Sequence, residues 1–209
     1  MTQTILATAY LPNILYFATI AQRKKISIEQ NETYLKQTFR NRTTILSANG
    51  PLDLTVPIIR TNGNHTQTSD IQIAYTEKWQ VRHWRAIVSA YNASPFFLYY
   101  QDELEQIIMD RHETLMELNS KLLSLLIKKI KIECEISFTN DYIPLPEKQD
   151  LRILISPKKE MSGMAQFTPY EQVFSTKTPF LPNLSILDLL FNLGPESNDY
   201  LLNKISLNY

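Results

Sequence analysis

The sequence ILATAYLPNILYFATIAQRKKISIEQ, from Ile5 to Gln30, holds two candidate strands with a helix between them. The runs Ile5–Tyr10 and Ile26–Gln30 are short and apolar, as is typical of buried strands. After Pro12, the segment Asn13–Gln22 is apolar on nearly all sides, so we expect a short buried helix there. The chain therefore begins with strands and one helix.

The remainder of the chain continues this mixture. Further runs with strand character lie at 43–46, 52–59, 71–75, 133–139 and 151–155, and helical patterns lie at 77–92, 101–132 and 182–193. Asn49-Gly50 between two of these runs predicts a β-hairpin. We expect one domain over residues 1–209, of the α/β or α+β class. It should have a mixed β-sheet, a central helical block and a buried C-terminal helix.

The composition excludes several classes of protein. The chain has 21 basic and 21 acidic residues, which argues against a protein that binds duplex nucleic acid. It has four glycines, and the closest pair, Gly50 and Gly63, is too widely spaced for a glycine-rich phosphate loop or dinucleotide fingerprint. One cysteine and three dispersed histidines provide no local metal-ligand motif. We therefore expect neither a metal nor a cofactor.

The apolar runs are too short for a membrane protein. None approaches the ~20 residues that a spanning helix needs. The N-terminal segment 1–21 is apolar, but no basic residue precedes its apolar stretch, as a signal peptide would require. We expect no membrane span and a cytoplasmic location.

The first candidate site is the basic segment KQTFRNR at residues 36–42. On a strand, Lys36, Arg40 and Arg42 share one face, and on a helix Lys36 and Arg40 still do. Converging cations suit a phosphate or a carboxylate, which arginine can bind through two hydrogen bonds. Residues 21–60 carry seven basic and three acidic residues, so a basic excess surrounds this segment. The alternative is a solvated basic edge that deters aggregation.

The second candidate is the pair Trp79 and His83, one turn apart on a predicted helix. A histidine beside a tryptophan can act as a general base, and we expect His83 at the rim of the main pocket. The alternative is a histidine at the edge of the core, bonded to a backbone carbonyl.

The third candidate is the polar stripe Ser185, Asp188 and Asn192 on the otherwise apolar last helix. A buried carboxylate needs donors or a changed protonation state, so Asp188 either braces a structure or lines a site. We expect Asp188 to be at least half buried. Arg40 or Arg42 should be its partner, and Asn192 should belong to the same network.

An ordered set of motifs resembles the WbqC-like protein family from residue 6 to about 195. The motifs are Ala9-Tyr10-Leu11-Pro12 with Tyr16-Phe17 and Ile20, KQTFRNR at 36–42, Asn49-Gly50, LTVP at 54–57, Trp79 with His83, and SILDLL at 185–190. Thr8-Ala9 departs from the Gln-Pro of typical members. The resemblance implies a bacterial protein related to members in O-antigen gene clusters, with glycine transfer to a surface polysaccharide as the implied activity.

The motifs and the resemblance together predict a transferase in the biosynthesis of surface polysaccharide (O-antigen) or another cell-envelope glycan, acting by acyl or aminoacyl transfer. Its anionic small-molecule substrate would be a nucleotide-sugar or an aminoacyl donor. His83 and Asp188 are the catalytic candidates, and the binding candidates are Lys36, Arg40, Asn41, Arg42, Tyr10, Trp79 and Asn192.

Two other functions stay open. One is a non-catalytic protein that binds a nucleotide-sugar or a similar anion, and the other is an assembly partner of an envelope enzyme. The distance of His83 from the basic segment separates them, because a base beside an anion site favours catalysis. The sequence does not determine the oligomeric state.

Overall fold

The computed structural model describes residues 4–146, 150–157 and 163–209. It contains a parallel sheet in the order β1-β2-β7, formed by β1 (Thr4–Ala7), β2 (Lys25–Glu29) and β7 (Glu135–Phe138). Helix α1 (Ile14–Ala21) connects the first two strands. Because all three strands run in the same direction, the segments that follow β1, β2 and β7 leave the sheet at one edge.

Helix α1 is buried along its length, as its sequence predicts. Every residue from Ile14 to Ile20 is buried. The helix begins at an N-cap, because Asn13 Oδ1 accepts a hydrogen bond of 2.9 Å from the backbone of Tyr16. The cap places Asn13 at the carboxyl edge of the parallel sheet.

The other strands form two-stranded antiparallel sheets. They are β3 (Arg42–Ser47) with β4 (Gly50–Thr55), β5 (Ile58–Ile59) with β6 (Gln72–Ile73), and β8 (Ala165–Phe167) with β9 (Ile205–Leu207). Gly50 has φ +102°, a conformation that glycine adopts without strain, and it pairs with Ser47 at the turn of the predicted hairpin. The mixed α/β class is confirmed, and the described strands are divided among these small sheets.

The helical block consists of α2 (Trp79–Tyr91), α3 (Phe97–Met109) and α4 (Leu115–Ile130). The expectation of a single helix at 101–132 is wrong, because the chain leaves the helical conformation between α3 and α4. Asp110 is extended, and Thr114 caps the new helix by accepting a hydrogen bond from the backbone of Glu117.

The C-terminal part also differs from expectation. The run at 151–155 forms α5 (Leu151–Leu154) and not a strand, because Asp150 caps it by accepting a hydrogen bond from the backbone of Arg152. Helix α6 (Ile186–Leu193) ends before Gly194-Pro195 as predicted, and the chain then continues into α7. The remaining short elements are η1 (Gly63–His65), η2 (Thr68–Asp70), η4 (Gly194–Glu196) and α7 (Ser197–Asn203).

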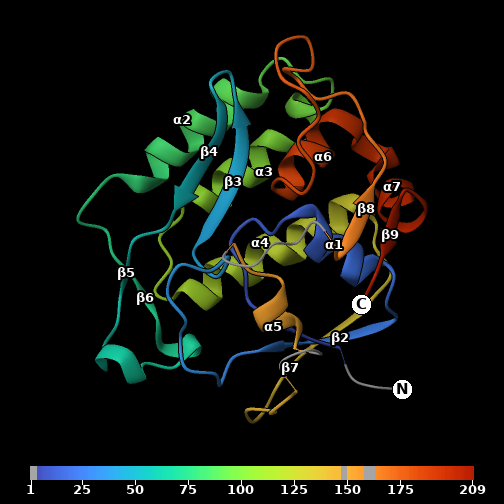
Figure 1. Ribbon diagram of the computed structural model, residues 1–209. Helices are drawn as coiled ribbons and strands as arrows, with labels where there is room; N and C mark the ends of the chain where they lie inside the picture. The colour runs from blue at the N-terminus through green and yellow to red at the C-terminus, as the bar shows by residue number, and fades with distance from the viewer. Residues whose placement is uncertain (1–3, 147–149, 158–162) are drawn as a thin grey trace.

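In Figure 1, β2 and β7 lie at the bottom of the molecule, the β3–β4 hairpin lies near the top, and α1 and α4 lie between them. Helix α6, near the C-terminus, is joined to the N-terminal third by backbone hydrogen bonds. Ser185 N donates to Thr44 O at 2.8 Å, and Ile186 N donates to Pro12 O at 2.8 Å. No helix among the described residues is long and apolar enough to cross a membrane.

Candidate functional site

A groove of about 790 Å³ opens where the two ends of the chain meet. It is lined by Asn13 after β1, Phe39, the β3–β4 hairpin, β8 and the segment 180–185 before α6. A recess of about 10 Å³, room for one water molecule, adjoins it and shares Asn13 and Phe39 with it. Thr8, Tyr16 and Arg40 also line the recess, which lies at the carboxyl end of β1. Open α/β sheets commonly bind ligands at this edge.

Two buried nitrogen atoms at the groove, Asn13 Nδ2 and Arg42 Nε, have no hydrogen-bond partner among the described residues. A third, Arg40 Nη2 at the recess, has an ion-pair contact with Glu32 but no aligned hydrogen bond. An unsatisfied buried donor costs about 1–3 kcal/mol, so these nitrogens indicate a place for acceptor oxygens. Phosphate and carboxylate oxygens are the strongest acceptors for such a set.

The orientation of the Asn13 side chain is determined by its capping role. Its Oδ1 accepts the hydrogen bond from Tyr16 N, and its Nδ2 therefore points away from the helix end. The side chain is 4 % exposed. Asn13 thus holds an amide donor at the boundary between the groove and the recess.

Arg40 is held rigidly and is only 2 % exposed. Its Nε donates to Glu32 Oε1 at 2.8 Å, and its Nη2 lies 2.6 Å from the same oxygen as an ion pair, without the alignment of a hydrogen bond. Asn119 Nδ2 on α4 donates to Arg40 O at 2.8 Å and to Thr8 Oγ1 at 3.1 Å. Both ends of the arginine are therefore fixed beside the recess.

Further buried charges support the same edge of the sheet. Arg152 Nη1 donates to Glu29 Oε2 at 2.8 Å, and Arg152 Nε and Nη2 donate to the two oxygens of Asp150 at 2.8 and 2.7 Å. These contacts attach α5 to the end of β2, and α5 supplies Leu151 to the recess wall. Burial raises the pKa of the neighbouring Glu32, although Arg40 acts in the opposite direction.

The basic segment does not have the periodicity expected of it. Residues 36–41 form neither a strand nor a helix, and Gln37 has φ +57°. The expectation that Lys36 and Arg40 share one face is therefore wrong, since Lys36 is exposed and Arg40 is buried. Arg42 lies at the start of β3, where its Nη1 is 3.7 Å from Asp53 Oδ2 in the groove. Asn41 is buried and donates to Val56 O at 2.8 Å.

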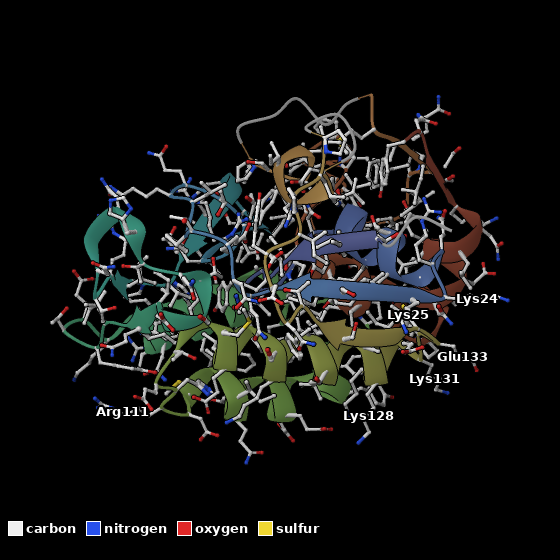
Figure 2. The ribbon with its side chains drawn as sticks, turned by 90° about the horizontal axis from the view of Figure 1, so that it is seen from below. Lys24, Lys25, Arg111, Lys128, Lys131 and Glu133 are labelled. Carbon is white, nitrogen blue, oxygen red and sulfur yellow. The ribbon has the colours of Figure 1, made fainter. Side chains whose placement is uncertain are left out.

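Figure 2 labels two further basic residues of segment 21–60, Lys24 and Lys25. Lys24 and Lys25 are at the amino end of β2, near Lys131 and Glu133, and Lys25 pairs with Glu135 at 2.7 Å. The groove adjoins the carboxyl end of the parallel sheet. These lysines are therefore at the opposite end of the strand from Asn13 and Arg40, so the basic excess is not gathered at the site.

His83 lies in the core, so the expected place at the rim of the main pocket is wrong. It is 5 % exposed, and it lines neither the groove nor the recess. Its Nδ1 is 3.0 Å from the Tyr10 hydroxyl, its ring also bonds to the backbone of Thr55, and its centroid is 5.1 Å from that of Trp79. Burial lowers the pKa of His83 to about 4, so the imidazole is neutral at pH 7.

Asp188 is completely buried, as predicted, but the expected arginine partner is wrong. Its Oδ2 accepts hydrogen bonds from the Tyr170 hydroxyl at 2.5 Å and from Gln172 Nε2 at 2.8 Å. Burial raises the pKa of the carboxyl group, which these neutral donors oppose. Asn192 Nδ2 reaches only the backbone oxygen of Asp188, at 2.7 Å.

Several residues of this site are not among the candidates predicted from the sequence. Asn13 could have been found, because an asparagine directly before an apolar helical run is a typical N-cap. Glu32, Asn119 and Arg152 carry no local signal, since each meets its partner only through the fold. The structure brings Arg40 and Arg42 to the opening, and it places Tyr10, Trp79 and His83 together in the core.

Comparison with known proteins adds a family and one relative. The sequence model of the WbqC-like protein family matches residues 8–168 and 159–200. The chain is 28 % identical over 225 residues to the uncharacterized protein Rv1507c of Mycobacterium tuberculosis, covering 94 % of this chain and 96 % of that protein. No solved structure matches.

Proposed function

Starting from the fact that this chain belongs to the WbqC-like protein family, we propose that its groove binds a small molecule through a phosphate or carboxylate group. The observation that carries the proposal is the pair of donors Asn13 Nδ2 and Arg42 Nε, which line the groove without a partner among the described residues, with Arg40 Nη2 at the adjoining recess. Arg40 and Arg42 keep the binding role expected from the sequence, and Asn13 joins them.

The rigidity of the site supports binding of this kind. Asn13 is held by the cap of α1, and Arg40 is held by Glu32 and Asn119. Donors that are already ordered lose little conformational entropy when a ligand arrives, so their hydrogen bonds contribute more of their strength to affinity. Lys36 lines neither the groove nor the recess, and we give it no part in binding.

The second candidate function adds group transfer to this binding. A transferase in the biosynthesis of surface polysaccharide or another envelope glycan is what the family resemblance favours, with a nucleotide-sugar or an aminoacyl donor in the groove. Neither His83 nor Asp188 lines the groove, and both are bonded to neighbours in the protein interior. We therefore assign them supporting roles, and the transfer step would rely on positioning of the donor by the groove.

Calorimetric titration with inorganic pyrophosphate tests the binding proposal. Asn13→Asp keeps an oxygen for the helix cap and puts a carboxylate in place of the amide donor, so affinity should fall by about tenfold or more. Arg42→Ala should weaken binding by a similar factor. Lys24→Ala removes the same charge at the far end of β2. Its affinity for pyrophosphate should stay within about twofold of that of the unmodified protein, since screening weakens distant charges.

Thermal unfolding of each variant shows whether the fold is kept. The proposal is overturned if pyrophosphate and citrate both fail to bind, or if folded Asn13→Asp and Arg42→Ala bind as tightly as the unmodified protein. Transfer is tested separately, by release of nucleotide from a nucleotide-sugar or of the carrier from an aminoacyl donor. Affinity without turnover of these donors supports the binding function alone.

A further inference from the structure

The groove is much larger than the anion that its donors would hold. At about 790 Å³ it is of the size that accommodates a whole metabolite, whereas the recess beside it has room for about one water molecule. The remaining wall must therefore contact the body of the ligand to which the anionic group is attached. The chemistry of that wall indicates what this body is.

Much of the remaining wall is made of rigid rings, of which the phenylalanine rings are flat. It contains the half-buried phenylalanines and the prolines Phe39, Phe167, Phe180, Pro51, Pro157 and Pro182. Phenylalanine and proline rings have few rotatable bonds, so a ligand that covers them orders little extra side-chain freedom. Covering the half-exposed faces of the phenylalanines with an apolar surface is also favourable in free energy, because it removes them from water.

The positions of two of these rings are set by the fold. Phe167 is the last residue of β8, which pairs with β9 in the register Phe167 opposite Ile205. The ring of Phe180 packs edge-on against Tyr170, with centroids 5.2 Å apart and an interplanar angle of 74°. Gln172 also holds the neighbouring Leu181 through its backbone N and O, at 3.0 Å each. The wall is therefore already in place before a ligand binds.

Resting on the proposed function, we infer that the ligand is a nucleotide, with its phosphate at Asn13 and Arg42, beside the recess that Arg40 lines, and its base against the phenylalanines of the groove. A flat aromatic base matches flat, rigid faces better than a flexible acyl chain does. A free sugar would find polar partners in Thr44, Asp53 and Ser185, but it would leave the phenylalanine rings without an aromatic partner. Stacking of a base on an aromatic side chain typically increases affinity by about fivefold to a hundredfold.

The experiment compares five probes by calorimetric titration: pyrophosphate, ribose 5-phosphate, the 5′-monophosphates of uridine and adenosine, and octyl phosphate. We expect the nucleotides to bind about tenfold or more tightly than ribose 5-phosphate. Phe167→Leu and Phe180→Leu keep an apolar side chain but remove the ring. These two substitutions should reduce the extra affinity that the base provides and leave the affinity for ribose 5-phosphate unchanged. Phe138→Leu, at an exposed position on β7 that does not line the groove, is the matched control.

The possible failures are distinct. If pyrophosphate and ribose 5-phosphate bind but a base adds no affinity, the nucleotide inference is overturned and the proposed function stands. If octyl phosphate binds as much more tightly than ribose 5-phosphate as the nucleotides do, and both leucine variants keep this extra affinity, the ligand body is aliphatic and the inference is again overturned. If no anion binds at all, the proposed function and this inference fail together.

Discussion

Glu32 and Arg40 form a buried ion pair in which one carboxylate oxygen, Oε1, lies 2.8 Å from Arg40 Nε and 2.6 Å from Arg40 Nη2. Their side chains are 7 % and 2 % exposed. Since both contacts are made with one oxygen, the pair restrains the guanidinium and still leaves Nη2 without an aligned acceptor. The pair thus fixes the guanidinium, and in the proposed function Nη2 is a donor beside the ligand.

Breaking this pair should lower the free energy of unfolding even when no ligand is present. Arg40→Ala leaves the Glu32 carboxylate buried without its partner, and we expect a loss of about 3–5 kcal/mol in the free energy of unfolding. The double substitution Glu32→Gln with Arg40→Met removes both charges and should recover most of that loss. Urea unfolding of the single and double variants measures both the loss and the recovery of stability. A double variant as unstable as Arg40→Ala would contradict this account.

Lys36 and Arg42 should differ in binding although both are basic residues of the same segment. Arg42 lines the groove with an unpartnered Nε, whereas Lys36 is exposed outside it. We expect Lys36→Ala to leave the dissociation constant for pyrophosphate within about twofold, and Arg42→Ala to raise it by about tenfold. Titration at two salt concentrations gives the comparison. Equal effects of the two substitutions would mean that the segment acts only through its total charge.

His83 should make the stability of the protein depend on pH. Its pKa is about 4 in the folded state and 6.5 as a free side chain, so only the unfolded chain gains a proton between these values. His83 therefore contributes stability that is complete above pH 6.5 and is lost as the pH falls towards 4, by roughly 3 kcal/mol in all.

Urea unfolding of the unmodified protein and of His83→Gln at pH 7 and pH 4.5 isolates this contribution. Glu32 and Asp188, whose pKa values are raised by burial, titrate in both proteins and cancel from the difference. We expect His83→Gln to be the less stable protein at pH 7. The difference in the free energy of unfolding between the two proteins should be smaller at pH 4.5. A constant gap would show that His83 does not titrate in this range.

Gln172 should matter for the groove although it does not line it. Its amide bonds to both backbone groups of Leu181 and to Asp188 Oδ2. Gln172→Ala removes these bonds, so we expect a loss of about 1–3 kcal/mol of stability and weaker binding of groove ligands. Gln166→Ala, at an exposed position on β8, is the control. Groove affinity equal to that of the control would show that the wall does not depend on Gln172.

Features that depend only on neighbouring residues could be predicted from the sequence. The buried helix after Pro12, the hairpin at Asn49-Gly50 and the burial of Asp188 follow from capping, turn geometry and apolar periodicity, which act over a few positions. The same local signals failed at 151–155, where the cap at Asp150 produces a helix from an apolar run that suits a strand.

The partners of the buried polar groups depend on contacts between distant parts of the chain. Arg40 pairs with Glu32 rather than with Asp188, and Asp188 instead receives neutral donors from Tyr170 and Gln172. His83 is a core residue because the fold surrounds its ring with Tyr10 and Trp79. A buried charge takes whichever partner the packing of the whole chain brings within about 3 Å, and no local spacing encodes that choice.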